Sequence, residues 1–336
     1  MHSRKFVVSL LSFLVVGGCA ESSDTAKALK GEVDSQALKK FIDGVIGDLI
    51  YVEGGSFLMG DFGGQFGPDQ IQYDGDADSK PLHEVNLTAY SMGRFKVTNE
   101  DFQFYLRANG LQLRAIGRGS QENWVAVSTT PKTPAHMDWY EAEQYCRWLA
   151  DISELPFALP TEAQWEYAAR SRGQYLPIAT DDGTYKVTQV PATQHDGPRG
   201  INISTYYDRK EFAEEQGWKT EGLTPLPVDR FPPNPLGLYA MSDNGLEWTN
   251  DWYAPDYYKH SPVNDPQGPG EAVWTDYYGR VTKVVRGQDY ANHAWAIGAN
   301  VHRTPAEPHG YISGNKLISL FSSTTRCVVN SPLPMN

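Results

Sequence analysis

The 336-residue chain has few cysteines, few basic clusters and few long apolar runs. Only three cysteines occur, and none lies within residues 284–303. No basic cluster longer than a few residues offsets the net charge of −12, so nucleic-acid phosphates and anionic membrane surfaces would be repelled. The apolar run at residues 6–16 is too short to span a bilayer. No internal repeat is found within the globular part of the chain.

The N-terminus has the pattern of an export signal. Basic residues, among them Arg4 and Lys5, precede the apolar run, and small residues lead to Cys19 and Ala20. Residues 16–20 resemble a bacterial lipobox, which predicts a diacylglycerol anchor on Cys19, and Ala20 after it favours the outer membrane. The alternative is cleavage after Ala20, which would release a soluble periplasmic protein.

The composition changes near Leu49, and three regions are predicted. Residues 1–19 form the lipoprotein signal peptide, and the polar residues 20–47 form a tether with a short helix near 35–41. Residues 48–331 form one globular domain, in which aromatic residues, glycine and proline are scattered through short segments. Such a pattern is typical of a loop-rich fold with an ample core.

Three helices are predicted from their N-terminal capping signals. They begin after Thr98, after Asp138 and after Thr161, and Gly110 ends the first of them. Short strands are predicted at residues 49–52, 57–59, 84–87 and 283–285. Residues 231–235, with three prolines, can form neither a helix nor a central strand.

Two cysteines remain after lipidation of Cys19. An exported chain favours a disulfide between Cys146 and Cys327, which are 181 residues apart. Closing so long a loop would stabilise the fold by roughly 5 kcal/mol in the chain-entropy model. Spacing alone also allows two separate buried thiols.

Nine short segments resemble the formylglycine-generating enzyme family, also called sulfatase-modifying factors, and occur in the family's order. They are residues 57–60 (FLMG), 96–99 (KVTN), 139–142 (WYEA), 145–146 (YC), 159–170 (LPTEAQWEYAAR), 231–234 (FPPN), 237–239 (GLY), 244–248 (NGLEW) and 285–287 (VRG). The resemblance implies a single α+β domain related to the C-type lectin fold, with little regular secondary structure. It also implies that Cys146 and Cys327 form the family's disulfide, although residues 324–326 depart from the usual Gly-Phe-Arg.

The resemblance further implies two calcium sites, since Ca²⁺ takes six to eight oxygen ligands. The first would use Asn202, the Ile203 carbonyl, Glu221 and the Leu223 carbonyl. The second would use Glu247, the Gly245 carbonyl and positions 240 and 243. There, Ala240 has lost its ligand and Asp243 offers a carboxylate. Glu247 could instead simply hydrogen-bond backbone amides beneath Trp248.

An acidic stretch imitates the start of an EF-hand loop. Asp74, Asp76 and Asp78 have the right spacing, but Ser79 stands at the glycine position and Val85 at the final glutamate position. A solvated acidic loop is therefore expected.

The absence of cysteine from residues 284–303 is the main departure from the family. Catalytic members hold copper there with two thiolates, and alignment on residues 286–287 places Asn292 and Ile297 at these positions. An amide and a hydrocarbon cannot hold soft Cu(I). Gln288 and Asp289 also replace the small pair that lines the family's substrate groove. The resemblance without its thiols predicts a pseudoenzyme that does not convert sulfatase cysteines.

The spacing of the polar residues near the lost thiolate positions does not indicate another metal site. These residues are His293, His302, His309, Asp289 and Arg303. Their spacing matches no known metal-ligand motif, so the histidines are expected to be hydrogen-bonded or at the surface.

The sequence leaves two alternative predictions of function. The first is an envelope lipoprotein that binds a protein partner, as secretion-regulating and gliding members of the family do, with a membrane contact only through its lipid and no nucleic-acid partner. The second is a periplasmic oxidase of altered chemistry, of the sulfatase-modifying or siderophore-maturing type. Aromatic residues near proline-rich loops could form a recognition surface or fill the core. They are Tyr253, Tyr257, Tyr258, Trp274, Tyr277 and Tyr278.

Overall fold

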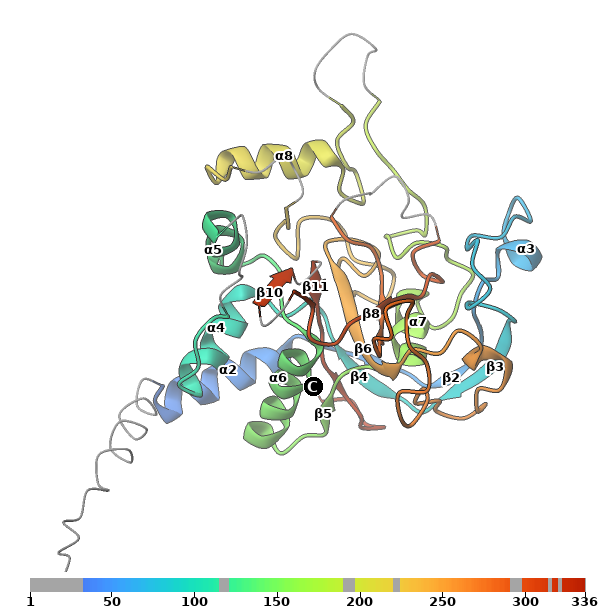
Figure 1. Cartoon of the computed structure of the whole chain (residues 1–336), viewed down its shortest axis with the longest axis horizontal. Helices are drawn as coiled ribbons and strands as arrows, with labels where there is room; N and C mark the ends of the chain where they lie inside the picture. Colours follow the sequence, from blue (N-terminus) through green and yellow to red (C-terminus); the bar gives the residue numbers. More distant parts are fainter. Residues whose placement is uncertain are drawn as a thin grey trace, which may run out of the picture.

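The structure, a computed structural model, describes residues 33–114, 121–189, 197–219, 224–290, 298–313, 316–319 and 322–335. Short strands lie at the centre of the molecule, and several helices gather on one side (Figure 1). Long irregular segments connect them. The predicted α+β class and the low content of regular structure are confirmed.

Two four-stranded sheets organise the domain. The first has the order β1 (Leu49–Val52), β4 (Tyr90–Gly93), β12 (Val328–Val329) and β5 (Phe157–Ala158), with antiparallel neighbours. The second has the order β11 (Ser323–Thr324), β6 (Leu246–Trp252), β7 (Lys283–Arg286) and β8 (Thr304–Ala306). Because β11 and β12 follow each other closely, the C-terminal segment joins the two sheets.

Two antiparallel pairs complete the strands. β2 (Gly55–Met59) pairs with β3 (His83–Leu87), and β9 (Tyr311–Ser313) pairs with β10 (Lys316–Ser319). The strands predicted at 49–52, 57–59, 84–87 and 283–285 are therefore confirmed, each within a residue or two of its observed bounds. Residues 231–235 form no helix or strand, as predicted.

The three capped helices are also confirmed. They are α4 (Asn99–Ala108), α6 (Trp139–Ser153) and α7 (Glu162–Ala169). Each begins with a reciprocal capping box, formed by Thr98 with Asp101, Asp138 with Glu141, and Thr161 with Gln164. Each box provides acceptors for two backbone N–H groups that would otherwise lack a partner at the helix N-terminus.

The helix α7 is buried on every face. All eight residues are buried, including Glu162 and Glu166. Arg286 lies 2.6 Å from Glu162 and 2.8 Å from Glu166, and Arg303 lies 2.7 Å from Glu162. Buried carboxylates persist when they are paired, so these arginines make the all-round burial possible.

Other helices surround this core. The helix predicted near residues 35–41 extends over α2 (Ser35–Gly47), and Ile42 on it is buried. Further helices are α3 (Gly63–Phe66), α5 (Gln121–Thr129), α8 (Tyr206–Glu215) and the 3-10 turn η1 (Tyr257–Lys259). Among the described residues, we find no helix with the length and apolar character needed to cross a membrane.

The predicted disulfide is present. Cys146 on α6 bonds to Cys327, which directly precedes β12. It ties a surface helix to the centre of the first sheet.

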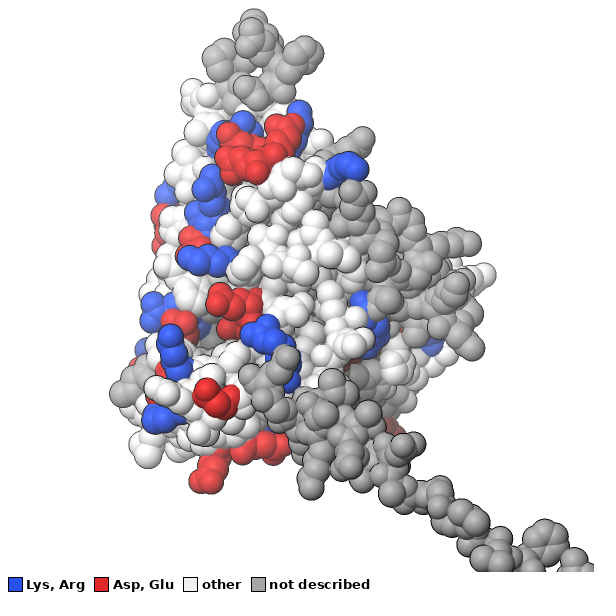
Figure 2. Space-filling view, turned by 90° about the vertical axis from the view of Figure 1, so that its left-hand side faces the viewer, with Lys and Arg blue, Asp and Glu red and all other residues white. Residues whose placement is uncertain are grey.

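The helical side of the molecule carries both signs of charge. On this face, Lys and Arg are interspersed with Asp and Glu, and a broad area carries neither (Figure 2). The net charge of −12 is therefore not gathered there into one acidic patch.

Candidate functional site

The strand β7 leads into the segment where the family holds its thiolates. Asn292, Ile297 and His293 lie outside the described residues, as does Cys19. The described chain reaches Tyr290 on one side and resumes at Gly298 on the other. These two residues are the flanks of the segment.

A buried His–Tyr pair forms one flank. The Tyr290 hydroxyl and His136 Nε2 share a short hydrogen bond, and Trp124 packs 5.8 Å from the His136 ring. Burial lowers the pKa of His136 to about 4, so the imidazole is neutral at physiological pH. Burial also raises the pKa of Tyr290, although the guanidinium of Arg209 opposes this shift. The pair is thus uncharged, and His136 Nδ1 has no hydrogen-bond partner within the described chain.

On the other flank, the polar side chains make contacts within the fold. His302 Nε2 lies 2.9 Å from the Tyr73 carbonyl, and Arg303 pairs with Glu162. His309 stacks on Tyr140 with ring centroids 4.4 Å apart. These contacts agree with the prediction of hydrogen-bonded or surface histidines. In the parts of the chain that are described, no histidine joins a cluster suited to a metal ion.

The acidic stretch differs from the expected solvated loop. Asp74 and Asp78 are each only 6% exposed, and one oxygen from each of Asp74, Asp76 and Asp78 lies within 4.8 Å of the others. Tyr253 donates to Asp78, and Lys80 donates to the Asp74 carbonyl. The expectation of a solvated loop was wrong because tertiary contacts with distant residues bury two of its carboxylates.

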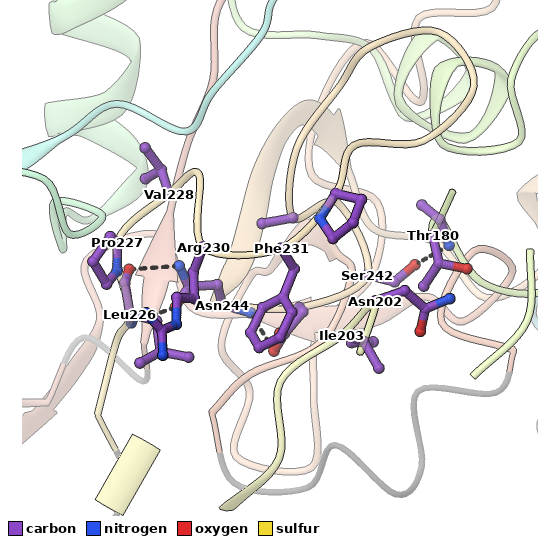
Figure 3. A pocket seen from close by; sticks show the side chains of 14 residues that line it. Thr180, Asn202, Ile203, Leu226, Pro227, Val228, Arg230, Phe231, Ser242 and Asn244 are labelled. Atoms are coloured by element: carbon purple, nitrogen blue, oxygen red, sulfur yellow. Dashed lines mark hydrogen bonds between the residues drawn. The ribbon is translucent and has the colours of Figure 1, made fainter. Parts of the chain in front are cut away.

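The first predicted calcium set lies beside a small cavity of about 20 Å³, enough for a single water or ion. Asn202, Ser242 and Thr180 lie at one end of this pocket, and Leu226, Pro227 and Arg230 at the other (Figure 3). Asn202 accepts a hydrogen bond from the Lys186 amide and donates to Asp181 and to the Thr184 carbonyl. Ile203 is buried beside it, whereas Glu221 and Leu223 lie outside the described residues. Calcium at this site therefore stays a prediction.

The predicted ligands of the second calcium site contact buried lysine and arginine side chains. Lys96 Nζ lies 2.6 Å from Glu247 Oε1 and 2.8 Å from the Gly245 carbonyl oxygen. Arg326 Nε lies 2.6 Å from Glu247 Oε2, and Arg209 pairs with Asp243. Glu247 thus does not merely hydrogen-bond backbone amides, because its carboxylate lies between two cations.

The six aromatic residues divide into two groups. Tyr253, Tyr257 and Tyr258 are buried, so they fill the core. Tyr277 and Tyr278 are 95% and 75% exposed. Trp274 packs on Tyr253 with centroids 5.0 Å apart and so anchors the exposed loop to the core.

The loop that carries the exposed tyrosines is held by side chains. Asp276 accepts from the amides of Tyr278 and Arg280, and its carboxylate pairs with the Arg280 guanidinium at 2.6 Å. Arg280 also lies 3.0 Å from Glu307. The two tyrosines are therefore presented on a loop with defined geometry.

Sequence reasoning missed the partners of the predicted residues. Lys96 and Arg209 were not singled out, although Lys96 stands between Phe95 and Val97 in a segment that resembles the family. A lysine in an apolar context was the available signal for Lys96. Nothing local indicated that Arg209 or His136 would be buried.

Comparison with known proteins supports the family. Residues 35–311 match the family described as sulfatase-modifying factor enzyme 1-like domain. The formylglycine-generating enzyme of Streptomyces coelicolor is 26% identical over 303 residues, with 78% of this chain and 86% of that protein covered. The inactive C-alpha-formylglycine-generating enzyme 2 of Mus musculus is 28% identical over 247 residues, with coverage of 62% and 70%. The serine/threonine-protein kinase pkn1 of Chlamydia caviae is 29% identical over 241 residues, but the match spans only 32% of its length.

Solved structures show the same fold. PvdO from Pseudomonas aeruginosa has a TM-score of 0.53 at 21% identity, covering 84% of this chain and 93% of that one. Variable protein 1 of Treponema denticola has a TM-score of 0.50 at 19% identity, covering 84% and 95%. With a family match over residues 35–311, most of its length, the chain belongs to the sulfatase-modifying factor, or formylglycine-generating enzyme-like, family.

Proposed function

We propose that this chain is a lipid-anchored envelope protein whose formylglycine-generating-enzyme-like domain binds a protein partner and does not convert sulfatase cysteines. One observation carries the proposal: Asn292 and Ile297 stand where catalytic members place two thiolates. Neither side chain suits monovalent copper, so the donor set does not fit the family's metal. A mouse relative named as inactive supports the idea that this fold can exist without the activity.

A conversion assay tests the loss of activity. The purified protein would be incubated with copper, oxygen and a sulfatase peptide that carries the substrate cysteine. The Streptomyces coelicolor enzyme would be the positive control. We expect no aldehyde by mass spectrometry with this chain. Aldehyde formation at a rate within a hundredfold of the control would overturn the proposal.

The exposed tyrosine loop supports the binding half of the proposal. Tyrosine supplies a large contact area at a low entropic cost, and aromatic residues are enriched at the centres of interfaces. Tyr277 and Tyr278 lie on a loop already ordered by Asp276 and Arg280, so binding would not have to order it. The geometry therefore favours this loop as the contact surface.

Crosslinking from the intact envelope tests the contact surface. The double substitution Y277A/Y278A should reduce recovery of the partner at least tenfold while leaving the melting temperature nearly unchanged, since both side chains are exposed. The exposed Val263, which is 44% exposed on another loop, offers a control as V263A. Equal recovery from wild type and the double variant would rule out this surface.

A periplasmic oxidase of altered chemistry is the second candidate. The observation in its favour is the buried His136–Tyr290 pair, because Tyr290 directly precedes the segment where the thiolates are lost. Metal analysis of the purified protein separates the two functions. Stoichiometric copper or iron would favour the oxidase, and calcium alone would favour the binding protein.

A further inference from the structure

The carboxylate of Glu247 lies at the centre of a fully buried cluster of charges. Arg326 contacts both of its oxygens, with Nε 2.6 Å from Oε2 and the terminal Nη2 2.9 Å from Oε1. Lys96 Nζ contacts Oε1 at 2.6 Å. All three side chains have no exposed area. The two cations together satisfy the carboxylate without water.

The ammonium of Lys96 also contacts the carbonyl oxygen of Gly245 at 2.8 Å. This oxygen and Glu247 Oε1 belong to the second predicted calcium set. The lysine enters from the segment after β4, while both oxygens belong to the segment around the start of β6. A single positive group therefore lies between the two oxygens that a bound cation would need.

The remaining members of the set are no better placed to bind a metal. Asp243 Oδ1 accepts from Arg209 and from the Asn244 amide, and its Oδ2 accepts from the Ser204 amide. Ala240 has no side-chain oxygen. Calcium takes six to eight oxygens, but each oxygen described here already has a donor of the chain itself. With Lys96 in contact with the Gly245 and Glu247 oxygens, the residues present do not fit a divalent cation.

The local charge leads to the same conclusion. Asp243 and Glu247 contribute two negative charges, and Lys96, Arg209 and Arg326 contribute three positive charges, so the cluster has a net charge of +1. A divalent ion would raise this charge to +3 in a buried environment, where repulsion is weakly screened. Binding would therefore require the lysine to leave or to lose its proton.

We infer that the Lys96 ammonium is the resident cation of this centre and takes the place of the calcium ion expected there from the family resemblance. The Lys96 ammonium makes the contacts of a bound cation, at 2.6 Å from the Glu247 carboxylate and 2.8 Å from the Gly245 carbonyl oxygen. The inference does not depend on the proposed function.

The substitution K96A tests the inference by opening the site. In EDTA, the melting temperature should fall by roughly 10 °C, because the loss of one partner leaves buried charges poorly compensated. Millimolar calcium should restore part of this loss, and native mass spectrometry should find one more bound calcium than in wild type. If K96A binds no more calcium than wild type, the inference is overturned.

Lys283 provides the matched control. It is also buried, and its Nζ lies 2.8 Å from the Asn250 carbonyl and 3.9 Å from the ring centroids of Trp139 and Trp252. No ion pair of Lys283 is found within the described chain. K283A should lower the melting temperature without any calcium response beyond that of wild type. A calcium gain equal to that of K96A would show that the response is not specific to Lys96.

Crystals of the wild-type protein grown with calcium provide a second test, which holds even if K96A does not fold. Electron density should show the lysine ammonium about 2.8 Å from the Gly245 oxygen. A calcium ion bound to Gly245 and Glu247 at about 2.4 Å, with Lys96 displaced, would overturn the inference.

Discussion

At the residue scale, the buried carboxylates of the core have opposite electrostatic environments. Burial alone would raise the pKa of Glu162, but Arg303 and Arg286 outweigh it and lower the pKa to about 2. Asp251 on β6 accepts from the Glu162 amide and has no ion pair within the described chain. Burial and the charge of Glu162 raise its pKa to about 7. Glu162 therefore stabilises the fold as an anion, whereas Asp251 destabilises it when ionised.

The substitution E162Q should destabilise the protein by about 3–5 kcal/mol at pH 7, because it leaves the buried Arg303 without its carboxylate partner and leaves Arg286 with Glu166 alone. The lowered pKa means that the stabilisation by Glu162 is present above about pH 4.5 and is lost as the pH falls toward 2. The difference between E162Q and wild type should therefore shrink in acid. Urea unfolding at pH 7 and pH 3 measures it. A loss below 1 kcal/mol at pH 7 would show that the pair is not stabilising.

The substitution D251N should have the opposite sign. A raised carboxyl pKa means that the contribution of Asp251 to stability is largest below about pH 4 and is lost as the pH rises toward 7. Asparagine keeps an acceptor for the Glu162 amide but carries no charge. We expect D251N to be more stable than wild type by about 2 kcal/mol at pH 8, and nearly equal at pH 4. Thermal melts across this range test it, and a destabilised variant at pH 8 would contradict it.

At the scale of elements, the C-terminal segment holds the domain together. β11 pairs with β6 in one sheet and β12 with β4 and β5 in the other. Cys327 and Arg326 lie between these two strands and bind α6 and Glu247. These long-range contacts fix the last strands in place, although each has only two residues.

Removal of the disulfide by C146S/C327S should lower the free energy of unfolding by roughly 2–5 kcal/mol, because the loop it closes spans 181 residues. The melting temperature should fall accordingly. Wild-type protein in a strong reductant should behave like the double variant. Identical melting curves of oxidised wild type and the variant would show that the disulfide does not stabilise the protein by restricting the unfolded chain.

At the scale of the whole molecule, the proposed attachment to the envelope depends on the predicted lipid on Cys19. The substitution C19A removes the acceptor thiol, so the protein should move from the membrane fraction to the soluble fraction. Detergent phase partition and mass analysis of the N-terminal peptide measure the change. If wild type is found in the aqueous phase and begins after Ala20, the protein is a soluble periplasmic one.

The sequence by itself determined the elements that depend on neighbouring residues. The capping boxes at Thr98, Asp138 and Thr161 each place a side-chain acceptor three residues before a free amide, so local chemistry sufficed. A similar box at Thr205 and Asp208 precedes α8, but its signal was overlooked in a polar stretch without a clear apolar face. The two cysteines and the loss of the thiolate pair could also be read directly from the residues.

Only the tertiary structure decided which charges are buried and which partners they find. Glu247 meets Lys96, 151 positions earlier, and Arg326, 79 positions later. Asp78 meets Tyr253, 175 positions later, which buries a carboxylate that was expected in a solvated loop. Such pairs form because the fold removes water from groups far apart in the chain, so each must find a partner of suitable charge or polarity. No local pattern encodes that choice.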